Sequence, residues 1–255
     1  MKIISSAQKL FMLNFPFNPV KRAKEVESLV MKNLERKYYR FRYASYYGGI
    51  ATADAVGCCF LCAYCWNYSR NLHPEKFGEF YSPEKASEKI LEIMKKKNVR
   101  KVRVSGAEPI LGEKSFEHFS KLFEKIYEAE PSSEFILETN GLILGLNEKF
   151  CEKLSKYPIF VRVSIKGWDE KSFEKISGAE GKFFIYPLKA VKFLQDLRVE
   201  AWPAVMKEIF GLDGIKILKK RMREIGIEGE IEIEYLEKYP FVVQNLEKRE
   251  LKLIE

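Results

Sequence analysis

The stretch that decides the fold and the chemistry is residues 57–65, Gly57-Cys58-Cys59-Phe60-Leu61-Cys62-Ala63-Tyr64-Cys65. It holds four of the five cysteines of the chain, all within eight residues. A small secreted protein spreads its cysteines as a disulfide framework, so this clustering indicates a metal site instead. Two ligand triplets are open. Cys58, Cys62 and Cys65 form C-x3-C-x2-C, whereas Cys59, Cys62 and Cys65 form C-x2-C-x2-C, the beginning of a bacterial ferredoxin run.

Neither a ferredoxin site nor a structural zinc site is complete here. A ferredoxin cluster needs a fourth thiolate, and Cys151, the remaining cysteine, lies in a predicted helix outside such a run. A structural zinc site usually has two separated Cys-x2-Cys knuckles. The C-x3-C-x2-C spacing fits a 4Fe-4S cluster held by three thiolates, with one iron left open. Adjacent cysteines do not easily reach one cluster, so Cys59 is predicted to be a neighbour of the site and Cys151 a packed core thiol.

The composition describes a folded protein. The 255 residues are 46% hydrophobic and 31% charged, which excludes a disordered chain and fits one large domain. No apolar run approaches the ~18–20 residues that a membrane span needs, and no signal pattern opens the chain, so we expect a cytoplasmic protein with no membrane contact. Abundant Lys and Glu with three Gln are typical of a thermophilic source.

From about residue 45, short apolar runs alternate with amphipathic ones. The predicted strands are residues 49–53, 101–104, 134–138, 160–165, 199–206 and 230–235, separated by helical patterns. The first of these helices begins at Ser82-Pro83, a helix cap followed by proline at the first helical position. Six βα units predict an α/β fold, a partial (β/α)6 TIM-like barrel, with a doubly wound sheet as the alternative. In either fold the chemistry belongs at the carboxyl ends of the strands.

Positive charge is concentrated at the N-terminus. Residues 1–43 hold ten basic and three acidic residues, so they account for seven of the eight net positive charges. We therefore expect a basic N-terminal arm over residues 1–44, with a helix around 21–37, that packs on the barrel. The barrel domain is expected over 45–240 and a C-terminal tail over 241–255.

The arm contains Arg36-Lys37-Tyr38-Tyr39-Arg40-Phe41-Arg42-Tyr43, in which cations and aromatic rings alternate. Such a run is able to follow a phosphate backbone and stack bases, which makes RNA a candidate substrate. In the alternative interpretation the rings pack the arm against the barrel while the cations face water.

Four short segments accompany the cysteines, each directly after a predicted strand. They are Cys65-Trp66-Asn67, Ser105-Gly106-Ala107-Glu108-Pro109, Glu138-Thr139-Asn140-Gly141 and Ser164-Ile165-Lys166-Gly167. With C-x3-C-x2-C and an aromatic residue before its last cysteine, the chain resembles the radical S-adenosylmethionine (radical SAM) superfamily over residues 48–206. The first segment, and the fourth with residues up to 178, resemble the branch related to pyruvate formate-lyase activating enzymes. The second resembles the Gly-Gly-Glu-Pro motif of that family, with Ala107 in place of one glycine.

The resemblance implies two cofactors. They are a 4Fe-4S cluster on Cys58, Cys62 and Cys65, and S-adenosylmethionine (SAM) chelated to the open iron. One electron from the cluster cleaves SAM, and the resulting 5′-deoxyadenosyl radical takes a hydrogen atom from the substrate. A ferredoxin or flavodoxin is implied as the electron donor.

The resemblance also implies contacts with SAM. Gly106 and Ala107 leave room for the methionyl amine, and Glu108 accepts a hydrogen bond from it, although this loop also fits an ordinary βα turn. The other expected contacts are those of Thr139, Asn140 and Ser164 with the ribose, Lys166 with the methionyl carboxylate, Tyr64 over the adenine, and Val205 in the same pocket. Lys166 alternatively is a solvated turn residue.

Three functions remain open from the sequence. The first is an activating enzyme that places a radical on a protein or modifies a peptide, and the second is a tRNA-modifying enzyme. The third is a non-catalytic iron–sulfur or zinc-binding protein, which the Glu108 loop and the six βα units disfavour. Of the two histidines, His118 is expected on a helix surface and His73 has no predicted role.

Overall fold

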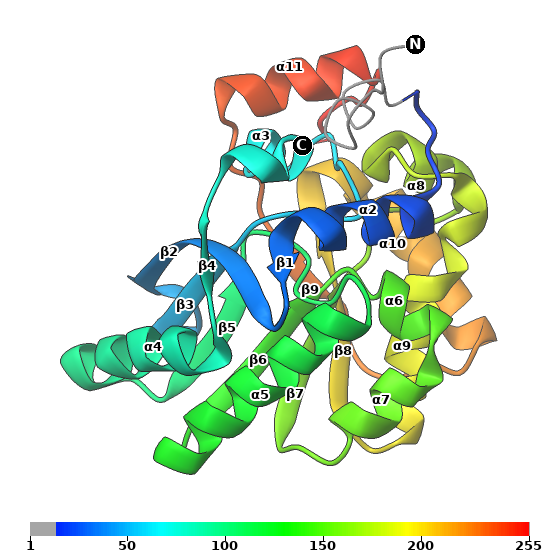
Figure 1. Cartoon of the computed structure of the whole chain (residues 1–255). Coiled ribbons are helices and arrows are strands. Elements are labelled where there is room, and N and C mark those ends of the chain that lie inside the picture. Colours follow the sequence, from blue (N-terminus) through cyan, green and yellow to red (C-terminus); the bar gives the residue numbers. More distant parts are fainter. Residues whose placement is uncertain (1–13, 255) are drawn as a thin grey trace.

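The computed structural model describes residues 14–254 and has one mixed sheet with helices outside it (Figure 1). Six parallel strands form most of the sheet, in the order β3 (Ile50–Ala55), β5 (Lys101–Ser105), β6 (Glu134–Thr139), β7 (Ile159–Ser164), β8 (Glu200–Met206) and β9 (Glu232–Glu234). Each lies within two residues of a predicted strand at its start. The strand order follows the chain order without reversal, so the doubly wound alternative is wrong. The sheet does not close on itself in the described part of the chain, as expected for a partial barrel.

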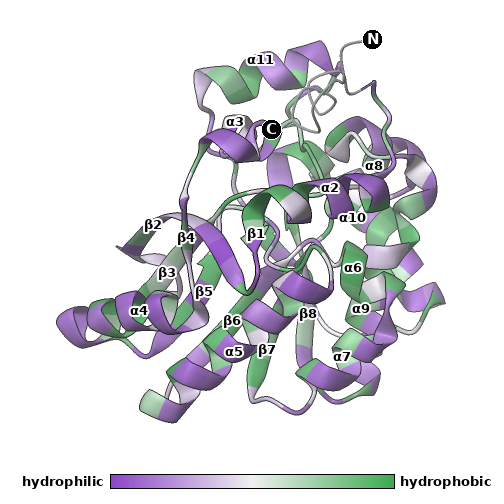
Figure 2. Ribbon diagram, in the orientation of Figure 1, coloured by the Kyte–Doolittle hydropathy of each residue, from purple (hydrophilic) through white to green (hydrophobic). Residues whose placement is uncertain are grey.

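The helices between the strands cover the outer face of the sheet. They are α4 (Pro83–Lys97), α5 (Glu113–Ala129), α6 (Leu142–Leu146), α7 (Glu148–Leu154), α8 (Glu170–Ser177), α9 (Ile185–Asp196) and α10 (Lys207–Glu224). The predicted cap of α4 is confirmed, because the Ser82 hydroxyl accepts a hydrogen bond from the Lys85 amide at 3.3 Å and Pro83 opens the helix. Figure 2 shows these helices with hydrophilic and hydrophobic residues on different sides.

The N-terminal segment differs from its prediction. Helix α2 (Pro19–Val30) ends seven residues before the expected end, and β1 (Met31–Lys32) and β2 (Glu35–Ala44) follow it. Asn33 adopts φ 55°, the left-handed conformation that lets the chain turn between these strands. Strand β2 pairs antiparallel with β3 and also with the short β4 (Glu79–Tyr81). The alternating cations and aromatic rings therefore follow the two-residue period of a strand, and residues 1–13 of the expected arm lie outside the described residues.

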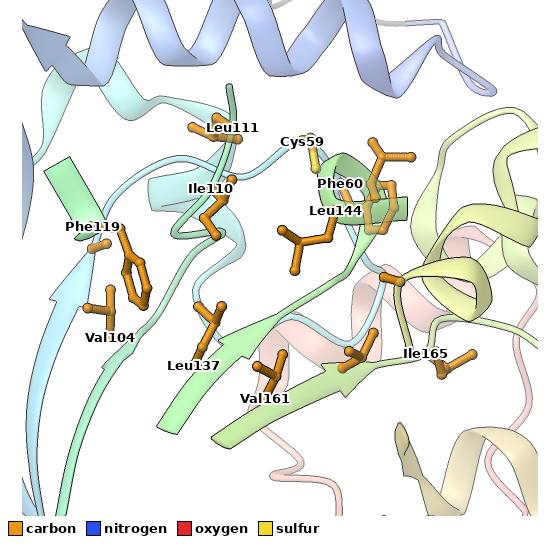
Figure 3. Packing of buried hydrophobic residues seen from close by; sticks show 14 of the residues in the cluster. Cys59, Phe60, Val104, Ile110, Leu111, Phe119, Leu137, Leu144, Val161 and Ile165 are labelled. Atoms are coloured by element: carbon orange, nitrogen blue, oxygen red, sulfur yellow. The ribbon is translucent and has the colours of Figure 1, made fainter. Parts of the chain in front are cut away.

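The two faces of the parallel sheet have opposite character. Side chains such as Val104, Leu137 and Val161 point to the helix side and are fully buried (Figure 3). Their strand neighbours, among them Arg103, Glu138 and Arg162, point to the other face, because successive side chains of a strand alternate. The inner face of the partial barrel therefore carries polar and charged residues, together with a small apolar cluster around Ile50 and Ile136.

Two further helices, α3 (Tyr68–Leu72) and α11 (Pro240–Lys248), follow the cysteine loop and β9 respectively. No helix within residues 14–254 is both long enough and apolar enough to cross a bilayer.

Candidate functional site

A cavity of about 660 Å³ runs along the inner face of the sheet. It reaches from the cysteine loop, which follows the carboxyl end of β3, to Tyr46 and Tyr47, which precede the amino end of the same strand. Cys58, Cys62 and Cys65 all line it. The three cysteines therefore line the part of the cavity at the carboxyl ends of the strands, where the fold predicts chemistry.

Cys59 has a different environment from the other three cysteines of the loop. Its side chain is 0% exposed, does not line the cavity, and lies among the hydrophobic core residues of Figure 3. The Asn140 side-chain amide donates to its sulfur at 3.1 Å. This separation favours C-x3-C-x2-C over the ferredoxin spacing.

The three cavity thiols fit an iron–sulfur cluster. No three His, Cys, Asp or Glu side chains within residues 14–254 converge on the position of a single metal ion. A zinc site requires such convergence, whereas a cluster binds each cysteine through a different iron. Side-chain amides also approach two of the sulfurs, Asn140 towards Cys58 at 3.7 Å and Asn71 towards Cys65 at 3.6 Å. Polar N–H donors beside sulfur suit a thiolate-bound cluster.

The acidities of these thiols differ. A hydrogen bond with the Cys59 thiol, opposed by burial, lowers the pKa of Cys58 below its ordinary value. Burial raises the pKa of Cys62 to about 12 and that of Cys65 to about 11. Cys58 is therefore the thiol of the three that loses its proton most readily.

Two arginines, the buried Arg22 and the half-buried Arg249, fix the backbone around the thiols. Arg22 of α2 donates to the main-chain carbonyls of Cys58 at 3.2 Å and Asn71 at 2.6 Å. Arg249, which follows α11, donates to the carbonyl of Leu61 at 2.6 Å. These residues lie 36 and 188 positions from their partners, so no local sequence pattern could have indicated them.

The Glu108 loop joins the neighbouring strand ends. The buried Glu108 carboxylate accepts hydrogen bonds from the Thr139 hydroxyl and the Asn140 main-chain amide, both at 2.7 Å, and from the Ile110 amide at 3.2 Å. Burial first, and then the nearby Cys58, raise the pKa of Glu108 to about 8. The expected hydrogen bond between Glu108 and the methionyl amine stays a prediction, because the carboxylate accepts its hydrogen bonds from protein groups in this structure.

The expected ribose contacts have a second role. The Thr139 hydroxyl donates to Glu108 and accepts from the Gly141 amide at 3.0 Å. The Asn140 carbonyl oxygen accepts from the Leu142 amide at 3.0 Å. Both residues line the cavity, but their hydrogen bonds hold the loop after β6.

Residues at the carboxyl ends of β7 and β8 complete the part of the cavity near the cysteine loop. Ser164 and Lys166 line it, and the Lys166 ammonium lies 5.2 Å from the centroid of the Tyr64 ring; their contacts with SAM stay predictions. The placement of Val205 in the pocket was wrong. Val205 is buried and does not line the cavity, whereas its neighbour Met206 does, because adjacent strand residues point to opposite faces.

Comparison with known families decides the assignment. A family profile described as "Radical SAM superfamily" matches residues 54–219, which include the cysteine loop and the loops after β5, β6 and β7. The chain belongs to the radical SAM superfamily. A probable GTP 3′,8-cyclase of Methanococcus maripaludis (strain C6 / ATCC BAA-1332) is 28% identical over 165 residues, 58% of this chain and 50% of that protein.

Solved structures share the fold of this radical SAM chain. One described as native anSMEcpe with bound AdoMet superimposes with TM-score 0.53 at 17% identity, over 72% of this chain and 52% of that one. A spore photoproduct lyase mutant with bound AdoMet and a dinucleoside spore photoproduct gives TM-score 0.57 at 14% identity, over 83% and 63%. The chain spans about half the length of the curated relative and of the first of these structures.

Sequence reasoning missed the charged residues of the inner face. Arg103 donates to Glu138 at 2.6 Å, and Arg162 pairs with Glu232 at 3.0 Å and Glu234 at 2.8 Å. The two-residue alternation of Lys101–Ser105 and Ile159–Ser164 is the signal that could have found this face.

The prediction for His118 was also wrong. Its ring is 1% exposed, lies 2.9 Å from the Tyr38 hydroxyl and 2.7 Å from the Leu34 carbonyl, and is thus part of the packing between α5 and β2. The prediction that Cys151 is a core thiol is confirmed, since it is fully buried in α7.

Proposed function

We propose that this chain is a radical SAM enzyme that binds a 4Fe-4S cluster through Cys58, Cys62 and Cys65 and cleaves SAM reductively. One observation carries the proposal. The three cysteines of the C-x3-C-x2-C motif line the same cavity as the Glu108 loop, while Cys59 is turned into the core. When bound, the cluster and SAM supply the electron transfer and the 5′-deoxyadenosyl radical that takes hydrogen from a substrate.

The residues of the chain itself have binding and positioning roles. Asn140, Asn71 and Arg22 surround the cysteine loop with N–H donors, which stabilises thiolates that carry negative charge. Glu108 holds the loops after β5 and β6 together, and so keeps the backbone of Gly106 and Ala107 at the cavity wall. Lys166 and Tyr64 offer a cation and an aromatic face to a SAM molecule beside the cluster.

The partner and the substrate class form part of the proposal. A small ferredoxin or flavodoxin is the expected reductant. The Cys65-Trp66-Asn67 segment favours an activating enzyme acting on a protein or peptide. A nucleotide substrate is the second candidate, and the similarity to a probable GTP 3′,8-cyclase supports it. The run from Arg36 to Tyr43 does not act as one RNA-binding surface. Its first two cations, Arg36 and Lys37, are buried and donate to main-chain carbonyls.

Anaerobic reconstitution tests the proposal. We expect about four irons per chain, as in a 4Fe-4S cluster, and release of 5′-deoxyadenosine after addition of dithionite and SAM. Cys58→Ser should abolish both, and the matched variant Cys59→Ser should retain both, because Cys58 lines the cavity and Cys59 does not. One zinc per chain and no cluster would support the non-catalytic alternative, and loss of activity in Cys59→Ser alone would support the ferredoxin spacing.

A further inference from the structure

Strand β2 contributes two arginines to the wall of the cavity opposite β9. Arg40 and Arg42 are two residues apart, point to the same face and line the cavity, with side chains 46% and 25% exposed. Arg40 lies directly opposite Asp54 of β3 in the sheet register. This pair of cations takes no part in the function proposed above.

Asp54 orients both guanidinium groups. Its fully buried carboxylate accepts from Nε of Arg40 and from Nε of Arg42, both at 2.7 Å, and from Nη2 of Arg42 at 3.3 Å. One carboxylate therefore serves two guanidinium groups, which leaves a net positive charge. Because Arg40 uses only its Nε in this pair, its Nη groups lie outside it.

The remaining donors suit an anion with several oxygens. A guanidinium has five N–H donors, so about seven donors of the two arginines are outside the pair with Asp54. A carboxylate can accept hydrogen bonds through two oxygens, whereas a terminal phosphate group has three and a polyphosphate has more. Preoriented arginine forks are the usual partners of phosphate.

Aromatic rings and carboxylates lie farther along the same cavity. Tyr46 and Tyr47 follow β2 and line the end of the cavity near the amino end of β3. There the Arg103 guanidinium lies 4.9 Å from the Tyr46 ring centroid. On the opposite wall Glu232 and Glu234 share one guanidinium, that of Arg162, so this wall has a net negative charge. A planar base with N–H groups stacks on such rings and donates to such carboxylates.

We propose, on the basis of the radical SAM function above, that the substrate is a nucleoside phosphate whose phosphate binds Arg40 and Arg42 and whose base lies along the inner face towards Tyr46. Asp54 lies against Gly106, so the arginines place the phosphate next to SAM, on a part of the cavity wall that β2 supplies rather than the cysteine and Glu108 loops. Loss of the two arginines should therefore weaken substrate binding and leave SAM binding unchanged.

The test titrates the cluster-loaded full chain, saturated with SAM, with GTP, ATP, guanosine, inorganic pyrophosphate and citrate. We expect a nucleoside triphosphate to bind, and the Arg40→Gln/Arg42→Gln variant to raise its Kd at least tenfold while the Kd of SAM is unchanged. Arg40→Gln alone, at the more exposed position, covers the case in which the double variant does not fold. Lys96→Gln/Arg100→Gln removes two exposed cations that do not line the cavity, and should have no effect.

Binding of citrate without any nucleotide, an equal loss of affinity in the Lys96→Gln/Arg100→Gln control, or no nucleotide binding would each overturn the phosphate site. Release of 5′-deoxyadenosine by the same preparation separates this failure from failure of the radical SAM function. Cys58→Ser, which should release none, should still bind the triphosphate.

Discussion

The side-chain amide of Asn67 donates a 2.6 Å hydrogen bond to the main-chain carbonyl of Gly106. Asn67 is the last residue of the Cys65-Trp66-Asn67 segment, and Gly106 belongs to the loop after β5. One buried hydrogen bond thus connects the cysteine loop to the loop expected beside the methionyl amine of SAM. The two motifs that define the candidate site are mechanically coupled.

Removing this connection should separate the two loops. In Asn67→Ala the Gly106 carbonyl loses its shorter hydrogen bond and keeps the 3.4 Å contact with Asn71, and loss of one such bond costs ~1 kcal/mol. We expect the Kd of SAM for the cluster-loaded protein to rise about tenfold, measured by equilibrium binding. Asn71→Ala, whose contact with the same carbonyl is 3.4 Å long and which also removes the donor beside Cys65, should have the smaller effect on the Kd of SAM. Equal losses in the two variants would contradict this role of Asn67.

We expect that substitution of Gly106 is harmful and that substitution of Ala107 by glycine is tolerated. Gly106 has φ 81°, and a Cβ there would lie 3.3 Å from the Ala55 carbonyl oxygen and 3.4 Å from the Asn67 amide. Gly106→Ala should therefore lower the free energy of unfolding by about 1 kcal/mol and also weaken SAM binding, because a left-handed backbone disfavours a side chain. Ala107→Gly, which restores the glycine of the family motif, should leave SAM binding within twofold. Urea unfolding and SAM titration measure both, and a Gly106→Ala protein that behaves as wild type would refute the argument.

The sequence was sufficient for features that repeat locally. The six strands, the α4 cap and the cysteine spacing follow from periodicity and short motifs, and the structure has them where they were expected. It was insufficient wherever a long-range partner decides the outcome. Arg22 and His118 are buried only because chain segments 36 or more positions away supply their hydrogen-bond partners. The run after Arg36 appeared to belong to a helical arm, but pairing with β3 makes it a strand.

Arg22 should influence the cluster as well as its loop. Its buried guanidinium donates to the Cys58 carbonyl, beside the proposed cluster site, where three thiolates would carry negative charge. Arg22→Leu should shift the reduction potential of the cluster to more negative values, on the order of tens of millivolts, because a nearby cation favours the reduced form. Potentiometric titration followed by EPR measures this shift. Arg22→Lys, which keeps the charge, should restore most of the potential; if it does not, the effect arises from packing.

Burial of His118 makes stability depend on pH. Desolvation lowers the pKa of His118 to about 4, against an ordinary value of 6.5. Between these values the unfolded chain binds a proton that the folded chain does not, so this contribution to stability is full above pH 6.5 and is lost as the pH falls towards 4. The shift corresponds to about 3 kcal/mol. Between pH 7.5 and pH 5, urea unfolding should therefore show wild type losing more stability, or gaining less, than His118→Gln, because the opposite contribution of Glu108, whose pKa is raised, is common to both proteins. His73→Gln, which changes the other histidine, should stay close to wild type, and an unchanged slope in His118→Gln would show that other groups control the acid sensitivity.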